Sequence, residues 1–285
     1  MKLPQCQDRL IEEVLKVQPN VVVVLHNGSP VELPWADKVS AILEMYLGGQ
    51  GVGEACDWLL NGEANPSGRL AETFPYRLED NPSYLHFPGN GKRVLYGEDI
   101  FVGYRYYDTK KVPVRYALGH GLSYTEFAYE DLNLSSAQMM DEDILTVSFK
   151  VKNTGKTEGK EVVQLYVADL CGISERPVKE LKGFAKVHLL PGEEKTVSME
   201  ILARDLSYYE ERLGDWYAPS GTYRILIGHA SDDIRLHADI VFETQKELPL
   251  RVDFTTTFGE LLDHTKTAPV ISELLALLAA AHASA

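Results

Sequence analysis

The strongest constraint on this fold is a series of short segments in the second half of the chain that alternate apolar and polar residues. Ile144 to Lys152 (ILTVSFKVK) alternates without interruption, and the turn Asn153-Thr154-Gly155 follows it. Period-two alternation predicts strands with one buried face and one solvated face. Such strands, evenly spaced from about Phe127 onward, predict an antiparallel β-sandwich. The further predicted strands are Glu161–Ala168, Lys186–Leu189, Thr196–Ile201, Gly221–Gly228 and Ile234–Phe242.

Two later segments do not alternate. Asp205 to Ser220 is predicted to be a long loop with four aromatic residues, and such aromatics more often close a sandwich edge or contact a neighbouring domain than bind a ligand. Val270 to Ala281 is an apolar, Ala- and Leu-rich run that predicts a helix in the C-terminal tail.

The first part of the chain has a different pattern. Gln7 to Lys16 has apolar residues at helical spacing and predicts an amphipathic helix. The apolar, β-branched run Val21–Leu25 and the segment Val39–Met45 are typical of strands buried on both faces, as in parallel sheets. Glu54 to Asn61 predicts the next helix. Strands that alternate with helices indicate an α/β layer, but two or three core strands make an incomplete one.

The sequence therefore predicts three parts. Residues 1–126 form a partial α/β sandwich layer, residues 127–245 form the all-β sandwich, and residues 246–285 form a tail with a helix. The fold class is α/β followed by all-β, with a helical tail.

Composition excludes several functions. The net charge of −14 and the pI near 5.0 argue against nucleic-acid binding, which needs clustered Lys and Arg. Cys6, Cys56 and Cys171 are far apart and odd in number, which favours free thiols in a reducing compartment. The sequence shows no signal peptide and no apolar run of about 20 residues that could cross a membrane. We therefore expect a cytoplasmic protein.

The glycine-rich stretch from Leu47 to Pro75 first suggests a phosphate site. Its run Gly48-Gly49-Gln50-Gly51-Val52-Gly53 misses the G-x-G-x-x-G spacing of a dinucleotide site, and no Gly-Lys-Ser/Thr follows as a P-loop requires. A tight turn that packs a helix closely against a sheet is the favoured interpretation. The cluster Asn65-Pro66-Ser67-Gly68 marks a second turn.

No motif carries catalysis or metal binding by itself. The histidines and carboxylates lack metal spacing, and no cofactor is predicted. Ser29 and Ser67 lack the context of a nucleophile elbow. Isolated carboxylates, for example Asp37 and Glu54, are favoured as caps or ion-pair partners.

The segment Tyr96 to Asp108 (YGEDIFVGYRYYD) combines five aromatic residues with Arg105. Such a loop can form a sugar platform, but aromatic and arginine-rich segments are also common at domain interfaces. The sequence favours the interface over the platform without excluding either.

Several pieces of the chain together resemble the C-terminal region of glycoside hydrolase family 3, the family of many β-glucosidases. The resemblance covers at least Met1 to Phe242, and the tail 255–275 is similar too. The matching pieces, in order, are Met1-x-Leu3-Pro4-x-x-Gln7 with Leu10-Ile11, Asn20–Trp35 (NVVVVLHNGSPVELPW), Gly48–Pro75, Tyr96–Asp108, Tyr116–Tyr129 (YALGHGLSYTEFAY), Asn153–Asp169 (NTGKTEGKEVVQLYVAD), Glu175–Glu193 and Gly221–Leu236.

This resemblance implies a particular enzyme. Members have a (β/α)8-type barrel, an α/β sandwich domain and often a fibronectin-type-III-like domain, and they hydrolyse β-linked glycosides with retention. An Asp of the barrel attacks the anomeric carbon, and a Glu of the second domain acts as acid and base, with the two carboxyls roughly 5–5.5 Å apart. The barrel has no counterpart in this sequence, and the acid/base loop precedes the stretch that matches Met1 to Gln7.

Neither catalytic carboxylate can therefore be placed in this chain, so no catalytic residue is assigned. By resemblance, Tyr96, Glu98, Asp99 and Arg105 are expected near the substrate, a β-glucoside or oligosaccharide bound by the full enzyme. We expect the chain to be inactive without the barrel and to self-associate through apolar surface that the barrel would cover. A non-catalytic carbohydrate-binding or structural module is the alternative.

Overall fold

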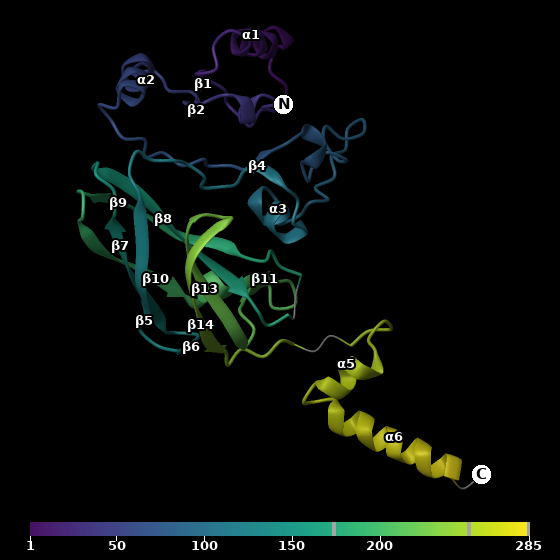
Figure 1. Ribbon diagram of the computed structural model, residues 1–285. Coiled ribbons are helices and arrows are strands. Elements are labelled where there is room, and N and C mark those ends of the chain that lie inside the picture. The colour runs from purple at the N-terminus through teal and green to yellow at the C-terminus, as the bar shows by residue number, and fades with distance from the viewer. Residues whose placement is uncertain (173–174, 250–251, 284–285) are drawn as a thin grey trace. The chain divides into compact units, whose positions relative to one another are not determined.

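The computed structural model describes residues 1–172, 175–249 and 252–283. The chain forms two compact units, each with its own fold (Figure 1). The first unit comprises Met1–Leu206 and Pro219–Glu243, and it contains both the α/β part and the sandwich. The second comprises Ser207–Ala218 and the chain from Thr244 onward.

The α/β part begins with the predicted helix, α1 (Gln5–Leu15), followed by β1 (Val22–Leu25) and β2 (Ala41–Glu44). The two strands pair in parallel and form a two-stranded sheet. Burial on both faces was the wrong expectation for both strands, because Val22 is 49% exposed, only Leu25 of β1 is buried, and no residue of β2 is buried. The reason is the size of the sheet: two strands leave open edges and incompletely covered faces.

The glycine-rich turn leads into α2 (Val52–Asn61), which begins two residues before the predicted start and has Gly62 as its C-cap. Gly62 has a left-handed backbone with φ of 77°, the conformation that commonly ends helices and that glycine adopts without strain. At Gly48, a Cβ atom would lie 2.4 Å from the side chain of Val52. The turn is thus closely packed against its own helix, whereas the expected packing of that helix on a sheet stays a prediction.

A small apolar core holds the α/β part together. Trp35 is completely buried there with Phe74, Leu25, Leu33 and Val31. Short strands β3 (Phe74–Pro75) and β4 (Val114–Tyr116) pair antiparallel beside it. A short 3₁₀ helix, η1 (Ala36–Lys38), follows Trp35. A second 3₁₀ helix, η2 (Leu78–Asp80), and helix α3 (Tyr104–Lys110) lie between β3 and β4 in the sequence.

The predicted sandwich is confirmed as two sheets. One has three strands in the order β10-β7-β5, and the other has five in the order β6-β14-β13-β8-β9. All pairings are antiparallel except that of β6 with β14. The strands are β5 (Phe127–Leu134), β6 (Gln138–Met140), β7 (Ile144–Asn153), β8 (Gly159–Asp169), β9 (Glu180–Leu189), β10 (Glu194–Leu202), β13 (Gly221–Ala230) and β14 (Asp233–Glu243).

Alternation along these strands builds the sandwich core. On β7, Leu145, Val147, Phe149 and Val151 are at most 1% exposed, while the residues between them are only partly buried. Opposing apolar residues come from the five-stranded sheet, because each sheet has one apolar face to bury. The other fully buried strand residues include Val163, Leu165, Tyr223, Ile225, Ile227 and Phe242.

The segment Asp205–Ser220 differs from the predicted loop. Its first residues end α4 (Ala203–Leu206), and the rest forms a hairpin of β11 (Tyr208–Glu210) and β12 (Asp215–Tyr217). The aromatic residues explain the hairpin, because they pair across it: Tyr209 lies opposite Trp216 with ring centroids 5.6 Å apart. Such cross-strand aromatic pairs stabilise short hairpins.

The second unit contains this hairpin and two helices of the tail. Helix α5 (Phe258–Asp263) begins with a capping box in which Thr257 and Glu260 exchange side-chain and backbone hydrogen bonds. Helix α6 (Ala268–Ala283) confirms the helix predicted at Val270–Ala281. Within the described residues, no helix has both the length and the apolar character that a membrane span requires.

Candidate functional site

The segment from Tyr96 to Lys110 is a turn followed by α3. The backbone N–H of Asp99 donates to the carbonyl of Tyr96 at 3.3 Å, and that of Phe101 donates to the carbonyl of Glu98 at 2.9 Å. Asp99 has a left-handed backbone with φ of 49°. Asp tolerates this conformation better than most residues, which suits it to the turn.

Helix α3 fastens the α/β part to the start of β9. The Tyr104 hydroxyl accepts a hydrogen bond from the backbone N–H of Leu181 at 2.7 Å. Asp108 pairs with Lys179 at 2.7 Å. The Arg105 guanidinium lies 3.3 Å from a carboxylate oxygen of Glu180. The contacts of these residues are those of an interface within the first unit.

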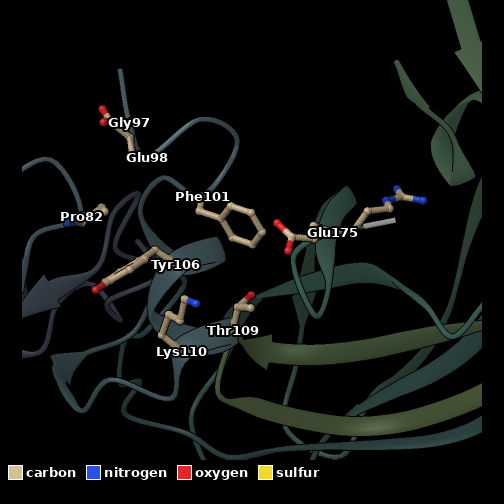
Figure 2. Close-up of a pocket in the computed structure, with 9 residues that line it drawn as sticks. Pro82, Gly97, Glu98, Phe101, Tyr106, Thr109, Lys110 and Glu175 are labelled. Atoms are coloured by element: carbon tan, nitrogen blue, oxygen red, sulfur yellow. The ribbon is translucent and has the colours of Figure 1, made fainter. Parts of the chain in front are cut away.

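A pocket of about 510 Å³ lies beside this helix (Figure 2). Figure 2 shows the Phe101 ring facing the Glu175 carboxylate, with Lys110 and Thr109 on the helix next to them. The α/β part contributes most of the lining, and the loop before β9 contributes the rest. The lining residues are Pro82, Gly97, Glu98, Phe101, Tyr106, Thr109, Lys110, Glu175 and Arg176.

Charged groups of the pocket differ in how far they are already paired. The Arg176 guanidinium donates to Asp169 at 3.0 Å, to Glu180 at 2.8 Å and to the carbonyl of Leu206 at 2.8 Å. Burial alone would raise the pKa of Glu180, but the charges of Lys182 and Arg176 and the hydrogen bond from Arg176 lower it. Arg176 therefore serves this network rather than the pocket.

Three other charged groups remain for a ligand. Among the described residues, Lys110 and Glu175 have no hydrogen-bond or ion-pair partner for their charged groups. The Oε2 atom of Glu98 is buried and lacks a hydrogen-bond partner there as well. A free cation, free carboxylates and an aromatic ring can bind a polyhydroxylated molecule, because carboxylates accept from hydroxyls while a ring stacks on an apolar sugar face.

The residues expected near a substrate lie in different settings. Glu98 lines the pocket. Tyr96 belongs to the same turn, but its side chain is 79% exposed. Asp99 occupies the strained turn position, and Arg105 belongs to the interface with β9. A role near substrate stays a prediction for all four.

Sequence reasoning missed Lys110, Glu175 and Arg176 as pocket residues. Lys110 follows the quoted aromatic motif directly, so a longer window would have included it. Glu175 and Arg176 lie far along the chain in the loop before β9, and no local pattern links them to α3. Across the described ranges, no group of three or more His, Cys, Asp or Glu side chains could hold a metal ion.

The fold is an α/β layer joined to a β-sandwich within one compact unit. A family model described as the glycosyl hydrolase family 3 C-terminal domain matches residues 1–124, and one for a fibronectin type III-like domain matches residues 161–231. Residues 1–124 therefore belong to the C-terminal domain of glycoside hydrolase family 3, and the resemblance seen in the sequence is confirmed.

Similar proteins are β-glucosidases. The chain is 50% identical to thermostable beta-glucosidase B of Acetivibrio thermocellus over 96% of this chain and 36% of that protein. It is 44% identical to a beta-glucosidase of Kluyveromyces marxianus over 87% of this chain and 29% of that protein. The chain thus spans about a third of the length of these relatives.

Solved structures agree with this. A family 3 beta-glucosidase of Bifidobacterium adolescentis superposes with a TM-score of 0.87 at 37% identity, covering 95% of this chain and 40% of that one. Beta-glucosidase 3B of Thermotoga neapolitana, solved with α-D-glucose, superposes with a TM-score of 0.78 at 40% identity, covering 84% of this chain and 34% of that one.

Proposed function

We propose that this chain is the C-terminal region of a retaining β-glucosidase and that it needs the barrel for activity. The observation that carries the proposal is the 50% identity along nearly the whole chain to a β-glucosidase of which it covers only 36%. In a two-carboxylate mechanism neither the nucleophile nor the acid/base can be replaced by scaffold. The α/β part and the sandwich then serve to hold the acid/base loop against the barrel.

An aryl β-glucoside assay tests this. The chain alone should release no aglycone above the buffer rate. The same chain fused behind the N-terminal two-thirds of a family 3 β-glucosidase should release it. Turnover by the chain alone would overturn the proposal, and an inactive but folded fusion would show that this chain is not a competent C-terminal region.

A second candidate is non-catalytic sugar binding by the chain itself. It is favoured by the pocket, in which the Phe101 ring and the Glu175 carboxylate face each other beside Lys110 (Figure 2). Calorimetric titration with glucose and cello-oligosaccharides should then show saturable heat. Phe101→Ala should abolish it, whereas Phe184→Ala should not, because Phe184 is an exposed aromatic of β9 that does not line the pocket. No heat with the wild-type chain would rule out this candidate.

The turn that carries Tyr96, Glu98 and Asp99 is our proposed substrate-facing element in the full enzyme. Its support is the exposed ring of Tyr96 and the unpartnered carboxylate oxygen of Glu98. Arg105 would act indirectly, because its guanidinium pairs with Glu180. In the fusion, Tyr96→Ala should raise KM for the aryl glucoside more than Tyr209→Ala, an exposed tyrosine outside this turn. Equal KM values would contradict the assignment.

We further propose that the isolated chain self-associates through the segment around this turn. Leu85, Phe87, Leu95 and Tyr96 are 87%, 72%, 65% and 79% exposed, which makes an unusually apolar surface. Light scattering behind size-exclusion chromatography should show a mass that rises with concentration. The double variant Leu85→Ser/Phe87→Ser should suppress the rise, and Phe184→Ser should not. A concentration-independent monomer would contradict this.

Domain boundaries at residues 126 and 245 and a cytoplasmic location are also proposals. The first is supported by the end of the C-terminal domain match at residue 124. The second is supported by three cysteines that the structure leaves as free thiols.

A further inference from the structure

Glu161, at the start of β8, is a completely buried carboxylate surrounded by donors. The Arg69 guanidinium donates to its Oε2 atom at 2.6 Å. Its Oε1 atom accepts from the Tyr129 hydroxyl at 2.6 Å and lies 2.5 Å from Nδ1 of His229. The Arg69 side chain is only 5% exposed, so this ion pair is shielded from water.

These partners come from both parts of the first unit. Tyr129 and His229 belong to sandwich strands β5 and β13. Arg69 belongs to the α/β part and follows the Asn65–Gly68 turn. The other ring nitrogen of His229, Nε2, lies 2.9 Å from the carbonyl oxygen of Gly121. Glu161 thus connects the sandwich to residue 69 directly and to residue 121 through His229.

The two connected segments of the α/β part are themselves paired. The backbone N–H of Leu70 donates to the carbonyl of His120 at 2.9 Å, and the N–H of Gly119 donates to the carbonyl of Leu70 at 2.8 Å. A Cβ atom on Gly121 would lie 2.8 Å from the carbonyl oxygen of Gly68, so no larger residue fits there without a shift. The cluster therefore holds two hydrogen-bonded backbone segments, 68–70 and 117–121, as one unit.

Hydrogen-bond valence fixes which groups of the cluster donate when Glu161 is ionised. A carbonyl only accepts, so Nε2 of His229 must carry a proton. An ionised carboxylate also only accepts, so Nδ1 must carry one too. Burial alone would raise the pKa of Glu161, but the hydrogen bonds from His229 and Tyr129 and the charges of His229 and Arg69 lower it. Glu161 is thus an anion between two cations.

Other titratable or charged groups surround this centre. They are Arg235 with its partner Asp233 on β14, Asp232 in the turn before it, and His120 from the α/β part. Burial is the main reason that the pKa of His120 lies below its ordinary value, and the charges of His229 and Arg69 lower it further. Protonated His120 would be a third cation near the same carboxylate.

We propose that Arg69, Glu161 and His229 form an ionic latch that holds the 68–70 and 117–121 segments on the sandwich, and that acid opens this latch before the sandwich unfolds. Protonation of Glu161 leaves Arg69 and the His229 imidazolium buried without a counter-charge, which is strongly destabilising. Water must then reach the two cations, which requires segments 68–70 and 117–121 to separate from the sandwich. The hydrogen bond from the backbone N–H of Leu181 to the Tyr104 hydroxyl involves no carboxylate, so it still joins α3 to β9 in acid.

Both titrations act in the same direction. His120 and Glu161 have folded pKa values below their unfolded ones, so each stabilises the closed latch above its unfolded pKa. The stabilisation from His120 is lost as pH falls below 6.5, and that from Glu161 is lost as pH falls below 4.5. The latch is therefore closed at neutral pH and open in acid.

Amide hydrogen exchange, normalised for its intrinsic pH dependence, tests the proposal. At pH 7, Glu161→Gln should speed exchange in segments 68–70 and 117–121 roughly 100-fold or more, while β7 stays protected. Wild-type protein should show the same selective loss at pH 4. The control Asp239→Asn, which breaks the exposed Arg224–Asp239 pair on neighbouring strands, should leave both segments protected. Equal protection in Glu161→Gln and wild type, or joint loss of β7 and both segments in acid, would overturn the latch.

A second measurement needs no variant. Nitrogen-15 spectra of the histidine rings at pH 7 should show two slowly exchanging N–H protons on His229. A ring with one N–H would overturn the proposal. If Glu161→Gln does not fold, the double variant Arg69→Met/Glu161→Gln should, because it removes both charges of the pair. That variant should lose the part of the acid response that lies below pH 4.5, because this part belongs to Glu161, and a retained response in that range would count against the latch.

Discussion

At the scale of single residues, Trp35 is the centre of the α/β core: it is fully buried, and its indole N–H donates to Asp8 of α1 at 2.9 Å. Trp35→Ala should lower the free energy of unfolding by about 3–5 kcal/mol, because it leaves a large cavity. Trp35→Phe keeps most of the apolar contact but loses the hydrogen bond to Asp8. This loss should lower the free energy of unfolding by about 1 kcal/mol beyond the effect of the smaller side chain. Urea unfolding followed by circular dichroism measures both, and Trp58→Ala on the partly exposed face of α2 is the matched control. A Trp35→Ala variant as stable as Trp58→Ala would show that this core does not stabilise the unit.

At the scale of elements, the buried side chain of Asn153, the last residue of β7, links this strand to the end of β9 and to the loops before β5 and β8. Its amide oxygen accepts from the Thr125 hydroxyl at 2.6 Å, and its amide nitrogen donates to the carbonyls of Thr157 and Leu189 at 2.8 and 3.1 Å. Asn153→Ala should destabilise the sandwich by about 2–4 kcal/mol, because buried carbonyls lose their donors. Asn133→Ala, on the exposed part of β5, should change the free energy by less than about 0.5 kcal/mol. Thermal unfolding of both variants compares them, and similar midpoints would refute the assignment.

At the scale of the whole molecule, acid should destabilise the chain. The pKa of Glu180 lies below 4.5 despite burial, because Lys182 and Arg176 favour its carboxylate. In the second unit the hydrogen bond from Arg212 lowers the pKa of Glu210 to about 2. A carboxyl with a lowered folded pKa stabilises the fold above its unfolded pKa, and this is lost as pH falls through the folded value. The midpoint temperature of thermal unfolding should therefore decrease as the pH falls below 4.5. Glu180→Gln should make this decrease less steep than the control Glu130→Gln on β5 does. An unchanged slope would show that Glu180 does not contribute.

The elements were more predictable than their partners. Alternation located β7, β8, β10, β13 and β14 within a few residues, because a strand with one buried face must alternate. It did not show that β6 pairs in parallel with β14, because register and order depend on contacts distant in sequence. The β11–β12 hairpin was missed because its apolar residues are cross-strand aromatic pairs rather than an alternating series.

The same division applies to the candidate site. Glu98 and the aromatic run were found because they are contiguous in sequence, whereas Glu175 joins the pocket only through the docking of α3 on β9.

By itself, the sequence determined the fold class, the family and most strand positions, because periodicity and family motifs are local properties of the chain. Only the tertiary structure decided which charges meet. Arg69 and Glu161 are 92 residues apart, and His229 is a further 68 residues along. Burial makes such a cluster energetically decisive, since an unpaired charge away from water is strongly destabilising, and no local pattern predicts which distant residue supplies its counter-charge.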